Sequence, residues 1–154
     1  MDFEKKRERA QFFYKKGKFK KAQEICESFL KKTPTDLQSR EMLGLIFSQM
    51  GRDELAIKHL QFVIENNPSS VTSSVALAKI YVNLAKYEES EKVLSRALEL
   101  APGSMDARLV LTDVYLHTDR SVEAGNMLAN INKQKPGMAD VLYRLGEVSY
   151  KHND

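Results

Sequence analysis

The sequence has little of what stabilises or anchors many exported proteins. It contains one cysteine, Cys26, and no tryptophan, so no intramolecular disulfide can form. No stretch approaches the ~18–20 consecutive apolar residues of a membrane-spanning helix. The first residues are charged and lack the apolar core of a secretory signal. With 42% hydrophobic and 29% charged residues, the chain is expected to be soluble and cytoplasmic. Export after removal of a signal stays open.

Motifs for catalysis are also missing. The three histidines, His59, His117 and His152, lie far apart with no ligand-like spacing. There is no glycine-rich phosphate loop and no strand-to-helix nucleophile motif. Cys26 falls in an apolar pattern and is expected to be a buried, inert thiol. We therefore predict no catalytic residues, no metal, no cofactor and no small-molecule substrate, and hence a protein that is not an enzyme.

Proline is scarce but regularly placed. The four prolines are Pro34, Pro68, Pro102 and Pro136, and each lies 34 residues from the next. A fixed period of this length is a signature of helical repeat proteins. It divides the chain into predicted units at residues 3–36, 37–70, 71–104 and 105–138, followed by a half unit at 139–154.

Other residues fall into the same register when positions are counted from the start of each unit. Position 8 is small or short, and position 11 is aromatic in the four full units. Position 20 is small, and position 24 is apolar. Position 8 holds Ala10, Gly44, Ala78, Thr112 and, in the half unit, Gly146, and position 11 holds Phe13, Phe47, Tyr81 and Tyr115. Position 20 holds Ala22, Ala56, Ser90 and Ala124, and position 24 holds Cys26, Leu60, Leu94 and Leu128.

This pattern resembles the tetratricopeptide repeat (TPR) family over essentially the whole chain. The family's large residue at position 4 is missing from the full units. The resemblance implies an all-α fold, a right-handed superhelical solenoid of antiparallel helix pairs with about nine helices. The last helix is expected to be a capping helix or the start of a truncated fifth repeat, and together the units form one domain.

Turn and cap residues agree with these boundaries. Gly17 and Gly51 stand between paired helices and tolerate left-handed backbone, whereas Ala85 and Asp119 replace them in the next two units. We expect those two turns to need another geometry or to accept strain. Asp36, Ser70 and Ser104 each follow a proline by two residues and are placed to cap the next helix.

In the TPR family, the first helices of successive units line a concave face that holds a peptide or a partner helix. Carried over by position, the resemblance predicts a partner-binding groove of amides, single charges and apolar anchors, a mixture suited to an extended peptide or an amphipathic helix. Its residues are Arg7, Gln11, Tyr14, Gln38, Glu41, Leu45, Gln49, Val75, Lys79, Val82, Asn83, Leu109, Asp113, Leu116, His117, Tyr143 and Glu147.

Charge is uneven along the chain. Residues 1–34 carry eleven Lys/Arg and five Asp/Glu, whereas the remaining residues carry thirteen and sixteen. The basic end is compatible with an acidic partner, a nucleic acid or an anionic membrane surface. We favour a solvated helix face, because Phe12, Phe13 and Phe19 fit packing positions of the repeat and a base-stacking platform needs exposed rings. A nucleic-acid partner is therefore not expected.

The leading prediction is a protein-interaction adaptor or scaffold that binds a peptide or helix of another protein. Two alternatives stay open. The terminal helix, residues 139–152, is rather apolar, so the chain could self-assemble as a homo-oligomer through its terminal helices. It could also be the recognition module of a larger multidomain enzyme or of a secretion or assembly factor.

Overall fold

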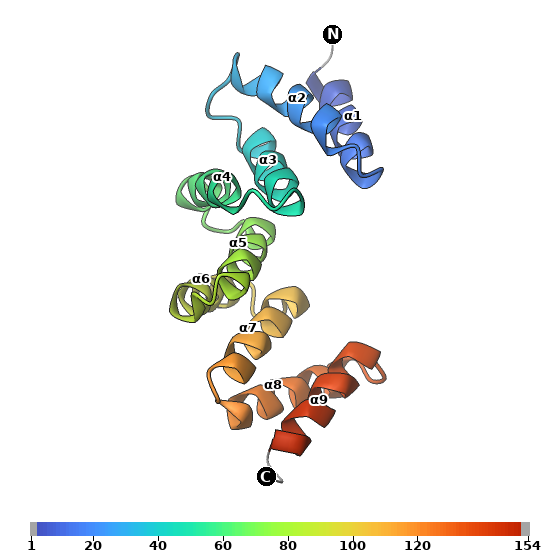
Figure 1. The fold of residues 1–154 in the computed structure, drawn as a ribbon, viewed down its shortest axis with the longest axis vertical. Helices are drawn as coiled ribbons and strands as arrows, with labels where there is room; N and C mark the ends of the chain where they lie inside the picture. The colour runs from blue at the N-terminus through green and yellow to red at the C-terminus, as the bar shows by residue number, and fades with distance from the viewer. Residues whose placement is uncertain (1–2, 152–154) are drawn as a thin grey trace.

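The computed structural model describes residues 3–151, and these form nine α-helices (Figure 1). Every helix has 12–14 residues, and each predicted full unit holds two of them. The helices are α1 (Phe3–Lys15), α2 (Phe19–Leu30), α3 (Leu37–Gln49), α4 (Asp53–Asn66), α5 (Val71–Asn83), α6 (Tyr87–Leu100), α7 (Met105–His117), α8 (Ser121–Gln134) and α9 (Ala139–Lys151).

The helices are arranged as a curved stack of pairs. Each helix packs against the next one along the chain, and α1, α3, α5 and α7 also contact one another in sequence. The odd-numbered helices therefore form an inner row, while α4 and α6 lie on the outer side of the curve (Figure 1). The predicted fold class, an all-α solenoid of helix pairs, is confirmed.

Left-handed backbone occurs at all four turns between paired helices. Gly17 and Gly51 have φ of 69° and 68°, and Ala85 and Asp119 have φ of 55° and 57°. The turn geometry is thus kept when glycine is replaced, and the two side chains are held in a conformation that L-residues adopt at a cost. Of the two outcomes expected for these turns, the structure has the strained one.

The predicted caps are in place. The side chains of Asp36, Ser70 and Ser104 accept hydrogen bonds from backbone N–H groups three residues later, at the start of α3, α5 and α7. Each cap satisfies one of the orphan donors at a helix N-terminus. The entry angles of α3, α5 and α7 are therefore fixed by short polar side chains.

Small residues allow the two helices of a pair to pack closely and form the core. A Cβ built on Gly44 would lie 2.6 Å from Cγ of Leu60 in α4, and Leu60 is completely buried. In the next pair, Ser90 is also completely buried and its hydroxyl donates to the Ala78 carbonyl at 3.0 Å. Small residues at positions 8 and 20 thus let the two helix axes come together.

One packing expectation is wrong. Phe13 and Phe19 are half-buried against the core, but 55% of the Phe12 surface is exposed. Phe12 occupies position 10, where Ile46 and Ile80 are fully buried in α3 and α5. In α1, by contrast, the side chain at this position is exposed.

Candidate partner-binding groove

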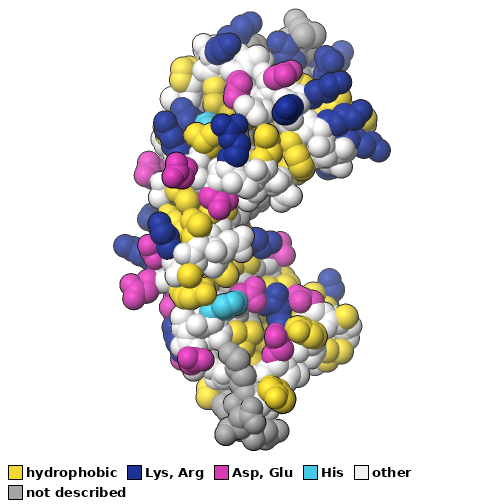
Figure 2. Space-filling view, in the orientation of Figure 1, with side chains coloured by type: hydrophobic (Ala, Val, Ile, Leu, Met, Phe, Trp, Pro, Cys, Tyr) yellow, Lys and Arg dark blue, Asp and Glu magenta, His cyan; other side chains and the backbone are white. Residues whose placement is uncertain are grey.

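Two adjoining pockets open along the inner row of helices. Leu45 of α3 lines both of them, so they meet at that residue and form one groove. Figure 2 shows the hollow that the curve leaves on one side of the molecule. We call the residues lining the two pockets the inner groove.

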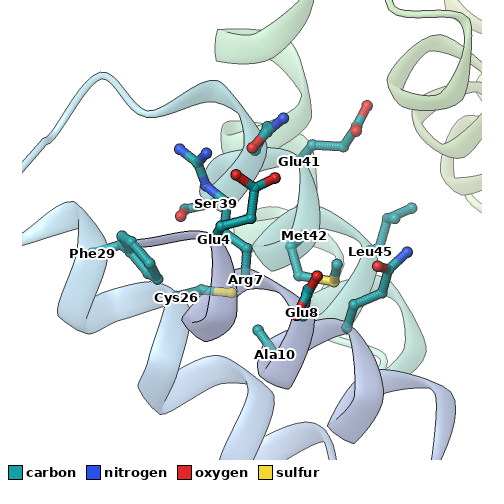
Figure 3. A pocket seen from close by; sticks show the side chains of 12 residues that line it. Glu4, Arg7, Glu8, Ala10, Cys26, Phe29, Ser39, Glu41, Met42 and Leu45 are labelled. Carbon is teal, nitrogen blue, oxygen red and sulfur yellow. The ribbon is translucent and has the colours of Figure 1, made fainter. Parts of the chain in front are cut away.

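The first pocket has a volume of about 320 Å³ and lies between α1, α2 and α3 (Figure 3). Its deep side is made by the buried side chains of Cys26 and Phe29 from α2, and its rim carries carboxylates from α1. The lining residues are Glu4, Arg7, Glu8, Ala10, Gln11, Cys26, Phe29, Gln38, Ser39, Glu41, Met42 and Leu45.

The second pocket, of about 310 Å³, continues from Leu45 toward α5 and α7. It combines an aromatic ring, aliphatic side chains, an amide and one charge of each sign. The lining residues are Tyr14, Leu45, Ser48, Gln49, Val71, Thr72, Val75, Ala76, Lys79 and Asp106.

The structure brings nine of the seventeen predicted groove residues into this surface. They are Arg7, Gln11, Tyr14, Gln38, Glu41, Leu45, Gln49, Val75 and Lys79. Val75 belongs mainly to the core, since only 7% of it is exposed. The remaining eight, Val82, Asn83, Leu109, Asp113, Leu116, His117, Tyr143 and Glu147, line neither pocket. Partner binding by any of them stays a prediction.

Two predicted groove charges already have partners inside the molecule. Arg7 Nη2 donates to Oδ1 of Asp36 at 2.6 Å, and Asp36 caps α3. Glu41 Oε1 accepts from the hydroxyls of Ser70 and Ser73, both at 2.7 Å, at the cap of α5. Both residues occupy position 5, so each ties one unit to the cap of the next. The sequence analysis did not predict this role. The available signal was that position 5 of one unit and the cap of the next recur at the same spacing.

The glutamine side chains of the groove, unlike these two charged residues, have no hydrogen-bond partners among the described residues. Within the described part of the chain, no hydrogen bond involves the side chains of Gln11, Gln38 or Gln49. All three are exposed. Each carboxamide can donate and accept, which is what the main chain of an extended polypeptide requires.

Toward the C-terminus, most of the predicted groove residues contact other side chains of this protein. The Asp113 carboxylate pairs with the Arg144 guanidinium, which links α7 to α9. The His117 ring stacks on Tyr87 of α6, with 5.4 Å between ring centroids. Leu109 and Leu116 pack partly into a core cluster with Leu128. The groove is therefore best formed around α1, α3 and α5.

The cysteine and the half-buried histidine are poorly suited to chemistry. Burial, assisted by the nearby charges of Asp36 and Glu27, raises the pKa of the Cys26 thiol to about 12, so the reactive thiolate is suppressed. Burial, followed by the charges of Arg40 and Lys58, lowers the pKa of His59. Its ring stacks on Phe47, with 5.6 Å between centroids. In residues 3–151, no cluster of three or more His, Cys, Asp or Glu side chains could hold a metal ion.

None of the nine helices described is both long and apolar enough to span a bilayer.

Two family models match overlapping stretches of the sequence. A model described as anaphase-promoting complex, cyclosome, subunit 3 matches residues 15–97, more than half of the chain, and a tetratricopeptide repeat model matches residues 86–145. Both matched stretches lie within the stack of helix pairs. The chain belongs to the tetratricopeptide repeat family. No curated protein sequence matches it significantly.

Several solved structures share the fold, and two of those that follow are described as TPR proteins. A TPR protein from Parabacteroides merdae has a TM-score of 0.84 at 16% identity, and the match covers 96% of this chain and 58% of that protein. MamA from residue 41 onward, from Desulfovibrio magneticus, has a TM-score of 0.87 at 15% identity, covering 98% of this chain and 85% of that one. YrrB, described as a TPR protein with an unusual peptide-binding site, has a TM-score of 0.78 at 19% identity, covering 94% and 75%.

At these identities the likeness extends to the fold alone. TPR folds serve as protein-interaction scaffolds, and this chain has that architecture. The chain spans 58% of the length of the Parabacteroides protein.

Proposed function

We propose that this TPR protein is an adaptor that holds an extended segment or helix of a partner protein in the inner groove. The observation that carries the proposal is the pair of pockets that meet at Leu45. Together they offer an uninterrupted surface across α1, α3 and α5. The peptide-binding site named for YrrB, which has the same fold, supports the idea that a solenoid with this fold can hold a peptide.

The chemistry of the groove supports a polypeptide ligand. The amides of Gln11, Gln38 and Gln49 are available for main-chain hydrogen bonds, and Leu45 and Tyr14 offer apolar contacts. Arg7 and Glu41 are held by the caps of the next units, so the groove walls are ordered before a partner arrives. Preorganised walls reduce the entropy cost of binding.

The test is a selection from a displayed random-peptide library against the immobilised protein. Enriched peptides should lose at least tenfold in affinity for Leu45→Glu, because a carboxylate would be desolvated where the two pockets meet. Leu100→Glu is the matched control, since Leu100 is 54% exposed and outside the groove. Absence of enriched peptides, or equal losses for both variants, would refute the proposal.

A second candidate function is self-assembly through α9. Leu142 and Tyr150 are 49% and 74% exposed and share one helix face with Gly146. A Cβ on Gly146 would meet nothing within 4 Å, whereas Gly44 at the same repeat position lies against Leu60. The face that packs on a second helix in α3 is thus open in α9. Sedimentation velocity decides the matter: self-assembly predicts a concentration-dependent oligomer abolished by Leu142→Glu, and a monomer at all concentrations excludes it.

A further inference from the structure

The outer face of α1 differs in kind from the same face of the later inner helices. At repeat positions 7 and 10, α3 holds Leu43 and Ile46, which are 1% and 0% exposed. In α1 the same positions hold Arg9 and Phe12, and both are exposed. The substitution of a cation for a core leucine suits this face to contact with water and anions rather than with another apolar helix.

Cations continue around this end of the molecule. Between Lys15 and Lys21 there are five lysines and no acidic residue, and Figure 2 shows Lys and Arg side chains gathered over the end formed by α1 and α2. The acids of α1, Glu4 and Glu8, instead line the first pocket. We call this the basic end surface and define it by Lys5, Arg9, Phe12, Lys16, Lys18 and Lys20, all exposed.

Phe12 is the one apolar side chain of that surface. Phe12 is 55% exposed, and the Lys16 ammonium lies 6.0 Å from the centroid of its ring. The stripe from Lys5 in α1 to Lys16, which directly follows α1, covers about 16 Å. A projecting ring among flexible cations matches the composition of surfaces that adsorb to lipid headgroups.

We propose that the basic end surface docks this protein onto a phospholipid bilayer that contains anionic lipids. The lysines would lie against the headgroup charges while the Phe12 ring enters the boundary with the acyl chains. None of the six residues lines either pocket of the inner groove, so a peptide could be held there at the same time. This role goes beyond the adaptor function and does not depend on it.

A bilayer fits this surface better than a nucleic acid does. Single-stranded nucleic acids are usually held in a charged groove with several stacking rings, whereas this surface has one exposed ring and lies outside both described pockets. Its five cations are four lysines and one arginine, Arg9, and lysine acts toward phosphate as a point charge without bidentate geometry. Charge attraction to a flat anionic surface needs no such geometry.

The experiment is co-sedimentation of the full chain with vesicles of phosphatidylcholine, with and without 30% phosphatidylglycerol, at roughly 0.1 M salt, where charges interact over about 10 Å. We expect at least tenfold stronger partitioning to the anionic vesicles. The double variant Lys16→Glu/Lys20→Glu should abolish that preference, since each basic residue near the surface contributes to it. Phe12→Ser should weaken binding severalfold, and more so at high salt, where the apolar contact dominates.

The matched control is Lys58→Glu/Lys92→Glu, which makes the same charge change at exposed sites in α4 and α6. Circular dichroism of every variant confirms that the helices are retained. Binding lost only in the basic-end variants supports the proposal. Equal partitioning to both kinds of vesicle, or equal loss in the control, overturns it. Tighter binding to a single-stranded oligonucleotide than to anionic vesicles, with no effect of Phe12→Ser on either, also overturns it and assigns the surface to nucleic acid.

Discussion

At the scale of single residues, the fold depends on positions where the repeat demands a small side chain or unusual backbone. Gly44 and Gly146 occupy the same repeat position but differ in surroundings. The first lies against Leu60, whereas the second faces open space. The same substitution made at both sites therefore tests the contact between α3 and α4.

Gly44→Val should lower the free energy of unfolding by about 1–3 kcal/mol, because the added methyl groups overpack the contact with Leu60. Gly146→Val, the same change without a neighbour, should stay within about 0.5 kcal/mol of the wild type. Urea denaturation of the three proteins measures both. Equal effects at the two sites would mean that the close approach of α3 and α4 does not limit this position.

Ala85 offers a prediction of opposite sign. Its φ of 55° costs an L-residue about 1–2 kcal/mol, while glycine there adds about 0.4–1 kcal/mol of entropy to the unfolded chain. Ala85→Gly should therefore stabilise the protein by roughly 0.5 kcal/mol. Ala129→Gly, at an exposed site inside α8, should destabilise it by about 1 kcal/mol. Thermal unfolding distinguishes them, and destabilisation of the same size by both would contradict the account of the turn.

At the scale of helices, the prolines located the units and the caps located the helix starts. The sequence therefore predicted nine helices and their pairing well, because small residues, turns and caps are local signals that recur every 34 residues. It could not predict that Arg7 and Glu41 are tied to the caps of the following units, since that needs the angle between pairs. It also misplaced Phe12, because the repeat register assigns its position to the core.

Asp36 supplies the pH dependence expected of such a cap. Burial alone would raise the pKa of its carboxyl, but hydrogen bonds from Ser39 and Arg7 outweigh it and lower the pKa below its ordinary 3.8. A lowered folded-state pKa stabilises the fold above about pH 4 and loses that effect as pH falls through the folded value. Asp36→Asn keeps a good capping residue but removes this titration.

The wild type should therefore exceed Asp36→Asn in unfolding free energy by about 0.5–1 kcal/mol near neutrality. The difference should shrink toward zero as the pH falls well below 4. Urea unfolding at a series of pH values measures it. A difference that stays constant down to pH 2 would contradict a charged, hydrogen-bonded Asp36 in the folded state.

At the scale of the whole molecule, stability is shared between neighbouring pairs. The core is divided into clusters along the stack, with Leu60 in the first and Leu128 in the last. In such a solenoid, damage to one pair spreads mainly to its neighbours. The groove is likewise local, since its well-formed part spans only α1, α3 and α5.

Leu128→Ala should remove about 2–5 kcal/mol of local stability, because Leu128 is completely buried. Backbone amides of α8 and α9 should then exchange with deuterium faster, while those of α3 and α4 keep their wild-type rates. Hydrogen exchange followed by mass spectrometry resolves the helices. Uniform acceleration across the chain would show a single cooperative unit instead.

The central claim, that the inner groove holds a polypeptide, is tested most directly by hydrogen exchange with and without a library-selected peptide. The account predicts slower exchange in α1, α3 and α5, centred on the turns of α3 around Leu45, and no change in the outer helices α4 and α6. Protection confined to the outer helices, or absent from α3 under saturating peptide, would contradict it.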